Sequence, residues 1–333
     1  MTRPTSARFD LPNAPFRVRK STASIRIACF VRSLFFISDQ IPRTNPLPEL
    51  PEVETMCRGI DPIVGSRVVA AELPPCDRRR ILVEPPIGTI DARLRGHRIE
   101  SIGRRGKRVL IRIDDGQVIV IEPRMTGLVL LAQPPTTEHL RFRLVLEGGP
   151  CDELLFWDRR GLGTVRLLTR EQSERLLGDD KLGPDALDVN APTLRDRLGS
   201  SRRAIKVALL DQKAVAGIGN LYAAEILHLA GVDPRARCDR LSGPQWQRIA
   251  SAIGDVLRDA ILHEGSTLSD GTYRNALNQD GSYQNLHRVY DREGEVCRRC
   301  GEGVIRRIVQ AQRSTFFCPH CQKRVGKHPA ITA

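Results

Sequence analysis

The sequence predicts an α+β protein of several domains: a β-sandwich, then a helical domain, then a hairpin held by cysteines. Three observations predict this fold class. Residues 67–170 contain alternating and short apolar runs typical of strands, residues after about 169 change to helical periodicity, and two C-x-x-C pairs lie near the end of the chain. We expect the strands to form an antiparallel sandwich that is preceded by one helix.

The chain has 333 residues and is strongly basic, with a net charge of +13 and a pI of about 9.8. Such a charge favours a polyanionic partner, most often nucleic acid. Its nine cysteines are too few for a disulfide-stapled secreted domain, which favours a reducing cytoplasm. Its apolar runs fall short of the ~18 residues that a spanning helix needs, so we expect no membrane segment.

Residues 1–47 differ in composition from the rest of the chain. They hold seven arginines, one lysine, two aspartates and no glutamate, a net charge of +6, together with five of the nine phenylalanines. Three interpretations are open: a mis-assigned start codon, a targeting peptide, or a genuine extra arm. We favour the first, and we expect residues 1–47 to be an extension, mis-called or disordered.

A short helix is predicted to begin at Pro51. Proline suits the first helical position, and Glu52 and Glu54 favour the positive end of the helix dipole. Gly65 lies just past its end. The strands predicted after it are 108–113, 117–122, 140–146, 154–157 and 164–168.

The helical part is predicted from local signals. Segments 193–198, 204–210 and 221–230 have helical character, and Gly231 ends the third. Ser242 and Gln245 form a capping box that opens a longer helix. Residues 265–296 are polar, and a loop of this length is usually functional or disordered. The predicted domains are 1–47 (extension), 48–172 (sandwich), 185–290 (helical), 291–325 (cysteine hairpin) and 326–333 (tail).

Four cysteines predict a metal site. Cys297 and Cys300 form one C-x-x-C pair, and Cys318 and Cys321 form another 17 residues later. Four thiolates at this spacing suit one tetrahedral structural Zn²⁺. Between the pairs, 305–309 and 314–317 are predicted strands of a basic hairpin, whose tip lies at or near 310–313. Such a hairpin can reach a DNA phosphate or groove.

The chemistry of the N-terminal part depends on Pro48. If the mature chain began there, its secondary amine would be neutral in roughly a tenth of molecules at pH 7, given an α-amino pKa near ~8. A neutral amine can attack a sugar carbon and form an iminium, and Glu49 beside it could carry protons. If Leu47 precedes it, the proline nitrogen is an amide and cannot react. On spacing alone, a capped helix with an acidic first turn is the better explanation of these residues.

Three motifs together resemble one family. Residues 48–54, the segment 217–225 (Gly-Ile-Gly-Asn-Leu-Tyr-Ala-Ala-Glu) and the cysteine hairpin with 312–318 are similar to formamidopyrimidine-DNA glycosylases of the Fpg/Nei group. The resemblance implies a β-sandwich with a leading helix, a helix–two-turn–helix domain and a C-terminal zinc finger. It also implies excision of oxidised purines such as 8-oxoguanine and formamidopyrimidines from duplex DNA. Strand cleavage by β,δ-elimination would follow, carried out by a monomer in the bacterial cytoplasm or nucleoid.

The resemblance assigns roles to single residues. Pro48 would be the nucleophile, Glu49 the acid/base and Lys107 a further catalytic residue, while Glu52 would help to order the site. The DNA-binding residues implied are Met125, Arg160, Leu162, Asn220 and Arg313. Met125 and Leu162 would fill the gap that a flipped base leaves, since apolar side chains commonly wedge such gaps. Asn220 and its glycine-flanked turn would offer an amide and backbone N–H groups to a phosphate.

The sequence departs from the family pattern at three places. Glu122 stands where relatives often carry a phosphate-binding histidine, and a carboxylate there is expected to repel DNA unless Arg124 compensates. Leu162 replaces a common phenylalanine, and residues 272–287 match the base-covering loop only loosely. Two other functions stay open: a damaged-DNA-binding protein without catalysis if residues 1–47 are retained, and an endonuclease VIII-like glycosylase for oxidised pyrimidines.

Overall fold

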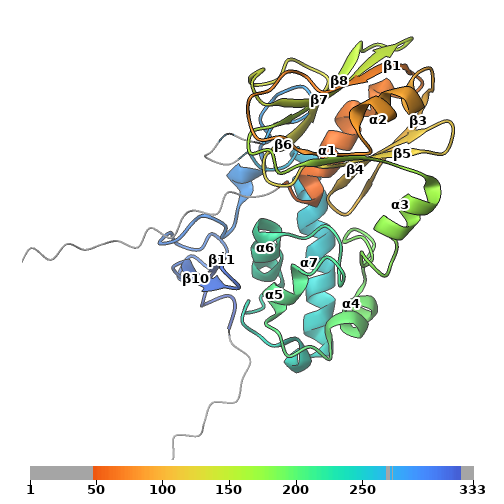
Figure 1. Cartoon of the computed structure of the whole chain (residues 1–333). Coiled ribbons are helices and arrows are strands. Elements are labelled where there is room, and N and C mark those ends of the chain that lie inside the picture. The colour runs from red at the N-terminus through yellow and green to blue at the C-terminus, as the bar shows by residue number, and fades with distance from the viewer. Residues whose placement is uncertain (1–47, 268–270, 272, 324–333) are drawn as a thin grey trace, which may run out of the picture. The chain divides into compact units, whose positions relative to one another are not determined.

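The structure is a computed structural model that describes residues 48–267, 271 and 273–323 (Figure 1). The expected extension and tail therefore lie outside the described residues, apart from their boundaries. Within this range the fold class predicted from the sequence is confirmed.

Two sheets form the sandwich (Figure 1). One has the strand order β1-β7-β8-β6 and the other the order β2-β9-β5-β4-β3. The strands are β1 (Arg67–Glu72), β2 (Leu82–Glu84), β3 (Ile99–Arg105), β4 (Arg108–Ile113), β5 (Val118–Glu122), β6 (Gly127–Leu130), β7 (Leu140–Glu147), β8 (Glu153–Asp158) and β9 (Thr164–Leu168). The five predicted strands agree with β4, β5, β7, β8 and β9 to within one residue at each end.

Two details of the sandwich differ from the expectation. The short edge strand β2 pairs with β9 in parallel, while the other pairs of both sheets are antiparallel. A second helix, α2 (Ile87–Leu94), follows β2 and buries Ile90 and Leu94 at i,i+4 spacing. Both features depend on contacts with residues distant in sequence, which local patterns do not record.

Helix α1 (Leu50–Ile60) leads the sandwich, as predicted. Glu49 and Glu52 form a capping box at its start, and Pro51 occupies its first turn. Its apolar face, including Val53 and Met56, joins one core with side chains of both sheets. Leu50 instead belongs to the core of the helical part, so α1 links the two.

The helical part contains the predicted helices and one more. Its helices are α3 (Arg170–Leu177), α4 (Ala191–Leu198), α5 (Ile205–Leu209), α6 (Asn220–Ala230) and α7 (Gly243–Leu262). Gly231 ends α6 in the left-handed conformation (φ 66°), and Ser242 with Gln245 forms the expected capping box of α7. Among the described residues, none of these helices is both long and apolar enough to cross a bilayer.

The cysteine hairpin consists of β10 (Arg306–Gln310) and β11 (Arg313–Phe317). Its residues Ile305 and Phe316 share one core cluster with the helical part, so the hairpin packs directly on it. The long polar segment 265–296 contains the short 3-10 helix η3 (Tyr283–Leu286); two others are η1 (Asp61–Ile63) and η2 (Cys238–Arg240). Residues 268–270 and 272 of that segment lie outside the described residues.

Candidate active site and nucleic-acid interface

Glu49 lies at the start of two helices. It is 2% exposed, occupies the N-cap position of α1, and directs its carboxylate to the first turn of α6. There it accepts hydrogen bonds from the backbone N–H groups of Gly219 (2.6 Å) and Leu221 (2.9 Å), with a longer one from Tyr222 (3.4 Å). A helix N-terminus stabilises a carboxylate in this way. Glu49 is therefore fixed by a segment 170 residues away, and Pro48, also buried, directly precedes it.

The Gly-Ile-Gly sequence before α6 allows this approach. A Cβ atom on Gly219 would lie 2.2 Å from the Glu49 carboxyl carbon. Gly217 has φ +112° and lies against Leu50, whose N–H donates to the Gly217 carbonyl at 3.1 Å. Side chains at either position would displace the start of α1, since both contacts are closer than packed atoms allow.

Glu52 joins three segments around Glu49. Its carboxylate accepts from the Glu49 N–H (2.9 Å), the Tyr222 hydroxyl (2.6 Å) and the Ser266 N–H (3.0 Å). Burial raises the pKa of Glu52 to about 7, against the hydrogen bond from Tyr222, which lowers it. The implied ordering role of Glu52 thus has a geometric basis, because its contacts tie α1 to α6 and to the segment after α7.

Lys107 lies in the turn between β3 and β4, the hairpin loop that the resemblance implied, and is partly exposed. Burial lowers the pKa of its ammonium, while the charge of Glu49 opposes this and that of Arg313 reinforces it. Burial likewise raises the pKa of the Glu49 carboxyl, and Lys107 counteracts the rise. The site therefore brings together Glu49, Lys107 and Arg313 from three parts of the chain.

One aspartate organises the two turns that carry the predicted wedge residues. Asp158, fully buried at the end of β8, accepts from the Thr126 hydroxyl and from the backbone N–H groups of Arg160 (3.2 Å) and Leu162 (2.7 Å). Met125 precedes Thr126 and is half-buried, as Leu162 is, while Arg160 is exposed. Met125 and Leu162 are thus not core residues, and the two turns are held side by side.

A buried lysine connects Asn220 to the hairpin. Lys206, on α5, donates to Asn220 Oδ1 (2.6 Å), the Ser314 carbonyl (2.9 Å) and Thr315 Oγ1 (2.7 Å). Burial lowers its pKa to about 7. Because Lys206 takes the oxygen of the Asn220 amide, the NH₂ group is left to face a ligand. Arg313, next to Ser314, is exposed and lies close enough for its charge to lower the pKa of Lys206.

One expectation about α6 needs correction. Its first backbone N–H groups were expected to be offered to a phosphate, yet those of Gly219, Leu221 and Tyr222 are donated to Glu49. Phosphate contact at this helix would therefore fall to Asn220, through its side chain and its own backbone N–H.

The four cysteines form a site that fits one Zn²⁺. Their Sγ atoms all lie within 4.8 Å of one another, with separations of 3.8 Å for Cys297–Cys321 and for Cys300–Cys318. Tetrahedral coordination with Zn–S distances near 2.3 Å places sulfur atoms about 3.8 Å apart, so the spacing suits the ion. His320 is half-exposed, lies 3.1 Å from Glu302, and is not one of the four thiolate ligands.

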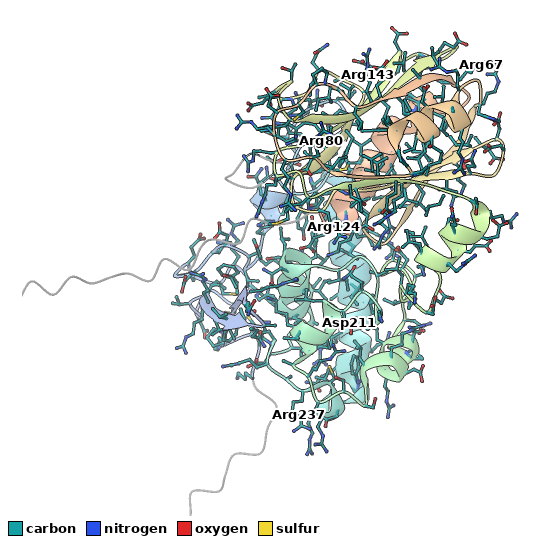
Figure 2. The ribbon with its side chains drawn as sticks, viewed as in Figure 1. Arg67, Arg80, Arg124, Arg143, Asp211 and Arg237 are labelled. Atoms are coloured by element: carbon teal, nitrogen blue, oxygen red, sulfur yellow. The ribbon has the colours of Figure 1, made fainter. Side chains whose placement is uncertain are left out.

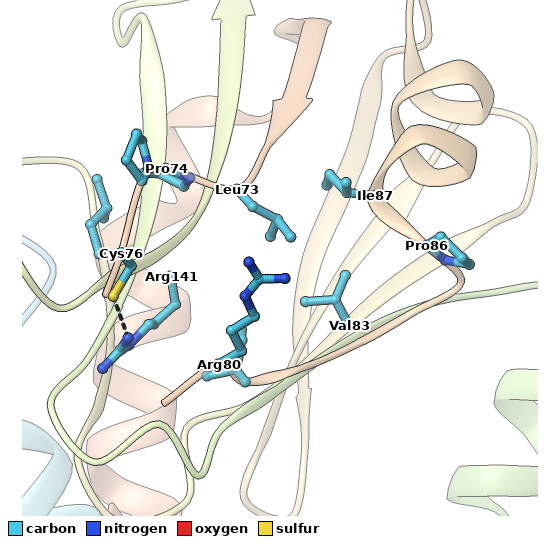
Figure 3. A pocket seen from close by; sticks show the side chains of 11 residues that line it. Leu73, Pro74, Cys76, Arg80, Val83, Pro86, Ile87 and Arg141 are labelled. Carbon is cyan, nitrogen blue, oxygen red and sulfur yellow. Dashed lines mark hydrogen bonds between the residues drawn. The ribbon is translucent and has the colours of Figure 1, made fainter. Parts of the chain in front are cut away.

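One pocket of the described structure lies away from these residues. A pocket of about 460 Å³ opens beside β2 and α2 (Figure 3). Leu73, Val83 and Ile87 line it together with Arg80, whose guanidinium points into it, and Arg141 at its edge contacts Cys76. None of the residues predicted for catalysis, DNA binding or metal binding lines this pocket.

Comparison with known proteins gives matches along nearly all of the described chain. The N-terminal domain model of formamidopyrimidine-DNA glycosylases matches residues 47–165, their H2TH domain model matches 182–272, and the zinc finger found in FPG and IleRS matches 294–324. Formamidopyrimidine-DNA glycosylase of Chloroflexus aggregans is 42% identical over 280 residues, covering 83% of this chain and 98% of the relative. That of Streptococcus mutans is 37% identical over 283 residues, covering 84% and 100%.

This chain belongs to the formamidopyrimidine-DNA glycosylase family. Solved structures agree with this assignment. Lactococcus lactis FPG in complex with Fapy-dG-containing DNA superposes with a TM-score of 0.72 at 32% identity, covering 83% of this chain and all of that one. The Thermus thermophilus protein gives 0.72 at 36% identity, covering 84% and 100%. The zinc finger match and the four-cysteine cluster together establish one structural zinc site.

Several residues of this glycosylase fold were missed by sequence reasoning. Asp158 and Lys206 hold the predicted DNA-binding residues in place, and Tyr222 holds Glu52. Glu225, fully buried on α6, accepts from the N–H groups of Val289 (2.9 Å) and Tyr290 (2.8 Å) ahead of the zinc finger. Tyr222 and Glu225 lie inside the recognised 217–225 motif, so their position there was the available signal.

Proposed function

We propose that this protein is a bifunctional DNA glycosylase of base-excision repair. It removes oxidised purines, 8-oxoguanine and formamidopyrimidines, from double-stranded DNA and then cuts the abasic strand by β,δ-elimination. Membership of the formamidopyrimidine-DNA glycosylase family along the whole matched length supports this function. The observation that carries it is that Glu49, directly after Pro48, is buried and bound to the start of α6, while the charge of Lys107 lowers its pKa against the effect of burial.

We assign the nucleophile to Pro48 with a free amine. Its nitrogen attacks C1′ of the damaged nucleotide, the bond from C1′ to the base breaks, and the base leaves with a proton. Loss of the proline proton and opening of the sugar ring give an iminium on C1′. Elimination then releases the 3′ phosphate and afterwards the 5′ phosphate. Family matching from residue 47 onward, and the foreign composition of residues 1–47, support a mature chain that begins at Pro48.

Glu49 supplies the proton transfers in this proposal. It is buried, burial raises the pKa of its carboxyl, and it directly follows the nucleophile, so it is suited to exchange protons with the reacting groups. Lys107 balances its charge from the β3–β4 turn. Met125 and Leu162 fill the gap left by the flipped nucleotide, and Arg160 faces the orphaned base. Each depends on the turns that Asp158 holds.

Asn220 and Arg313 bind phosphates of the damaged strand. Lys206 fixes both elements, because it donates to Asn220 Oδ1 and to the carbonyl of Ser314, the residue after the exposed Arg313. Zn²⁺ held by Cys297, Cys300, Cys318 and Cys321 stabilises the hairpin that carries Arg313. We propose the domain limits 48–172, 185–290 and 291–325, and action as a monomer in the bacterial cytoplasm or nucleoid.

Borohydride trapping tests the proposal. The chain beginning at Pro48 and the chain of 333 residues are each incubated with 8-oxoguanine duplex and sodium borohydride, after intact-mass measurement of both. We expect a covalent protein–DNA adduct with the first, because only a free secondary amine forms a reducible iminium. An adduct of equal yield from an intact 333-residue chain would contradict the assignment of Pro48. Binding without any adduct from either chain would favour the non-catalytic alternative.

Lesion preference is decided in the same assay. A duplex with an oxidised pyrimidine is included, because Lactococcus lactis FPG has also been crystallised with oxidised-pyrimidine DNA. Faster single-turnover excision of 8-oxoguanine supports the proposed substrate class. Faster excision of the pyrimidine lesion would favour the endonuclease VIII-like alternative.

A further inference from the structure

A buried carboxylate lies among arginines at the end of β5. Glu122 has a side chain that is 7% exposed, and its oxygens lie 2.8 Å from Arg108 Nε, 3.0 Å from Arg124 Nε and 3.7 Å from Arg166 Nη1. We call Glu122, Arg108 and Arg124 the Glu122 cluster. The carboxylate expected to repel DNA at this position is thus enclosed by cations.

Two of the arginines face Glu122 with Nε, at the inner edge of the guanidinium. Arg108 donates a hydrogen bond to one carboxylate oxygen, and Arg124 forms an ion pair with the other. Among the described residues, their terminal nitrogens contact no other side-chain partner. Arg124 lies between β5 and β6 (labelled in Figure 2), and its side chain is about half exposed (54%). An arginine anchored through Nε keeps two outward N–H donors, which match the geometry of a phosphate.

The third arginine is engaged elsewhere. Arg166 donates through Nε to Glu84 at 2.9 Å, and its contact with Glu122 is the longest of the three. Glu122 therefore neutralises one of two remaining guanidinium groups, and the Glu122 cluster keeps one net positive charge. A buried carboxylate that serves only stability needs one partner, whereas two arginines with free outer nitrogens suit an anionic ligand.

The cluster lies between two parts of the proposed site. Arg108 directly follows Lys107 and is close enough for its charge to lower the pKa of that lysine. Arg124 directly precedes Met125 and has a left-handed backbone (φ 54°), a conformation that is uncommon for side chains other than glycine and is often found at functional sites. A DNA strand that contacts both Lys107 and Met125 passes this cluster.

We propose that Glu122 is a positioning residue for DNA binding. It holds Arg108 and Arg124 by their Nε atoms so that the outer nitrogens of both arginines bind one backbone phosphate. The inference rests on the proposed function, which makes damaged duplex DNA the ligand. A carboxylate at this position therefore strengthens DNA binding, although its own charge is repelled by phosphate.

The substitution Glu122→Gln separates this inference from simple repulsion, because the two predict opposite signs. Fluorescence anisotropy measures Kd for a duplex with a tetrahydrofuran abasic analogue, which cannot be processed. Removing a negative charge strengthens binding if Glu122 only repels DNA. If Glu122 positions the arginines, E122Q binds at least about threefold more weakly, since phosphate contacts are lost. Equal or tighter binding by folded E122Q overturns the inference.

Arg124 provides a second test that does not disturb the core. Arg124→Ala should weaken binding and reduce the slope of log K against log salt by about 1, as expected for one lost phosphate contact. Arg124→Lys keeps the charge but loses the Nε anchor and the fork. We expect it to bind nearly as weakly as Arg124→Ala, whereas wild-type affinity of Arg124→Lys overturns the inference even if E122Q fails to fold.

Two controls complete the design. Glu147→Gln removes the same charge at an exposed carboxylate (61% exposed) and should not weaken binding. In the Arg124→Ala background, E122Q should cost less affinity than in wild type, because part of its effect acts through Arg124.

Borohydride trapping of the wild-type chain beginning at Pro48 is run in parallel. If the wild type forms the adduct and E122Q binds DNA as tightly as the wild type, only this inference is wrong. If the wild type neither forms the adduct nor binds lesion duplex, the proposed function is wrong.

Discussion

At the scale of single residues, Glu49 is a carboxylate that is both buried and held by the backbone of another helix. Both carboxylate oxygens are occupied by backbone donors of α6, and desolvation raises its pKa, which the charge of Lys107 opposes. A carboxylate held so tightly cannot turn away to follow a moving substrate. Substrate must instead be delivered to it, which agrees with a reaction on a nucleotide flipped out of the duplex.

Replacing Glu49 by glutamine should therefore stop chemistry while leaving the fold. The amide keeps one oxygen for Gly219 or Leu221 but cannot transfer a proton. In single-turnover assays of 8-oxoguanine excision, E49Q should be slower by roughly 10²- to 10⁴-fold. Glu147→Gln, which changes an exposed carboxylate of the sandwich (61% exposed), is the control and should excise nearly normally. An E49Q enzyme as fast as this control would contradict the role of Glu49.

Glu52 should impose a pH dependence on stability. Its pKa is about 7 in the folded protein and near 4.5 when unfolded, so the folded state holds the proton more tightly. Its contribution is full below pH 4.5 and is lost as the pH rises to 7. Relative to Glu52→Gln, the wild type should lose at most roughly 3 kcal/mol of unfolding free energy across this range.

Urea unfolding of wild type and E52Q at pH 5, 6, 7 and 8 measures this difference. The gap between the two unfolding free energies should change steadily up to pH 7 and then become constant. Two curves that stay parallel from pH 5 to 8 would show that Glu52 does not titrate in this window.

At the scale of elements, the turn of the zinc hairpin is unusual. Ala311 and Gln312 connect β10 to β11, and both have positive φ values, 47° and 61°. Such two-residue turns favour Asn-Gly, because other residues pay about 1 kcal/mol for a left-handed backbone. Arg313 directly follows this turn, so the strained backbone of the turn sets the position of Arg313.

Ala311→Asn with Gln312→Gly should stabilise the hairpin by roughly 1 kcal/mol. Hydrogen exchange of the β10 and β11 amides, at saturating zinc, would report this as slower exchange by about fivefold. Ala311→Val, a β-branched residue at the same strained position, should have the opposite effect. Faster exchange in the Asn-Gly protein would show that the turn is not a source of strain.

The elements that could be predicted are those with local signals. α6 ends at a glycine and α7 opens with a capping box, so both were found from the sequence. α2 begins after Pro86 without a side-chain cap, and β2 is three residues long with its partner β9 about 80 residues away, so local patterns gave neither. The candidate site divides in the same way. Pro48, Glu49 and the cysteines lie in motifs, whereas Asp158 and Lys206 matter only through contacts made in the folded chain.

At the scale of the whole molecule, one arginine joins the sandwich to the helical part. Arg104 on β3 is 8% exposed and binds Asp185 through both terminal nitrogens (2.6 and 3.0 Å), while its Nε meets Glu54 of α1 at 2.9 Å. Asp185 and Glu54 would both lose this partner if the arginine were removed. The docking of the two parts therefore depends on a bridge between residues 81 positions apart.

Arg104→Leu should destabilise the protein by about 3–5 kcal/mol, the usual cost of leaving buried charge unpaired. Arg58→Leu is the matched control, because it removes the exposed partner of the same Glu54 and should cost less than about 1 kcal/mol. Thermal unfolding by calorimetry measures both, and a split into two transitions would show that the parts separate before they melt. Equal effects of the two substitutions would contradict the importance of the bridge.

The anchoring of Glu49 on α6 has a consequence for synthesis on the ribosome. If the mature chain begins at Pro48, as proposed, its reactive end emerges first, yet the groups that hold the Glu49 carboxylate are translated some 170 residues later. A prematurely terminated product that lacks α6 would carry the proposed nucleophile but no ordered catalytic pair. Such an unfinished chain is therefore expected to lack cutting activity.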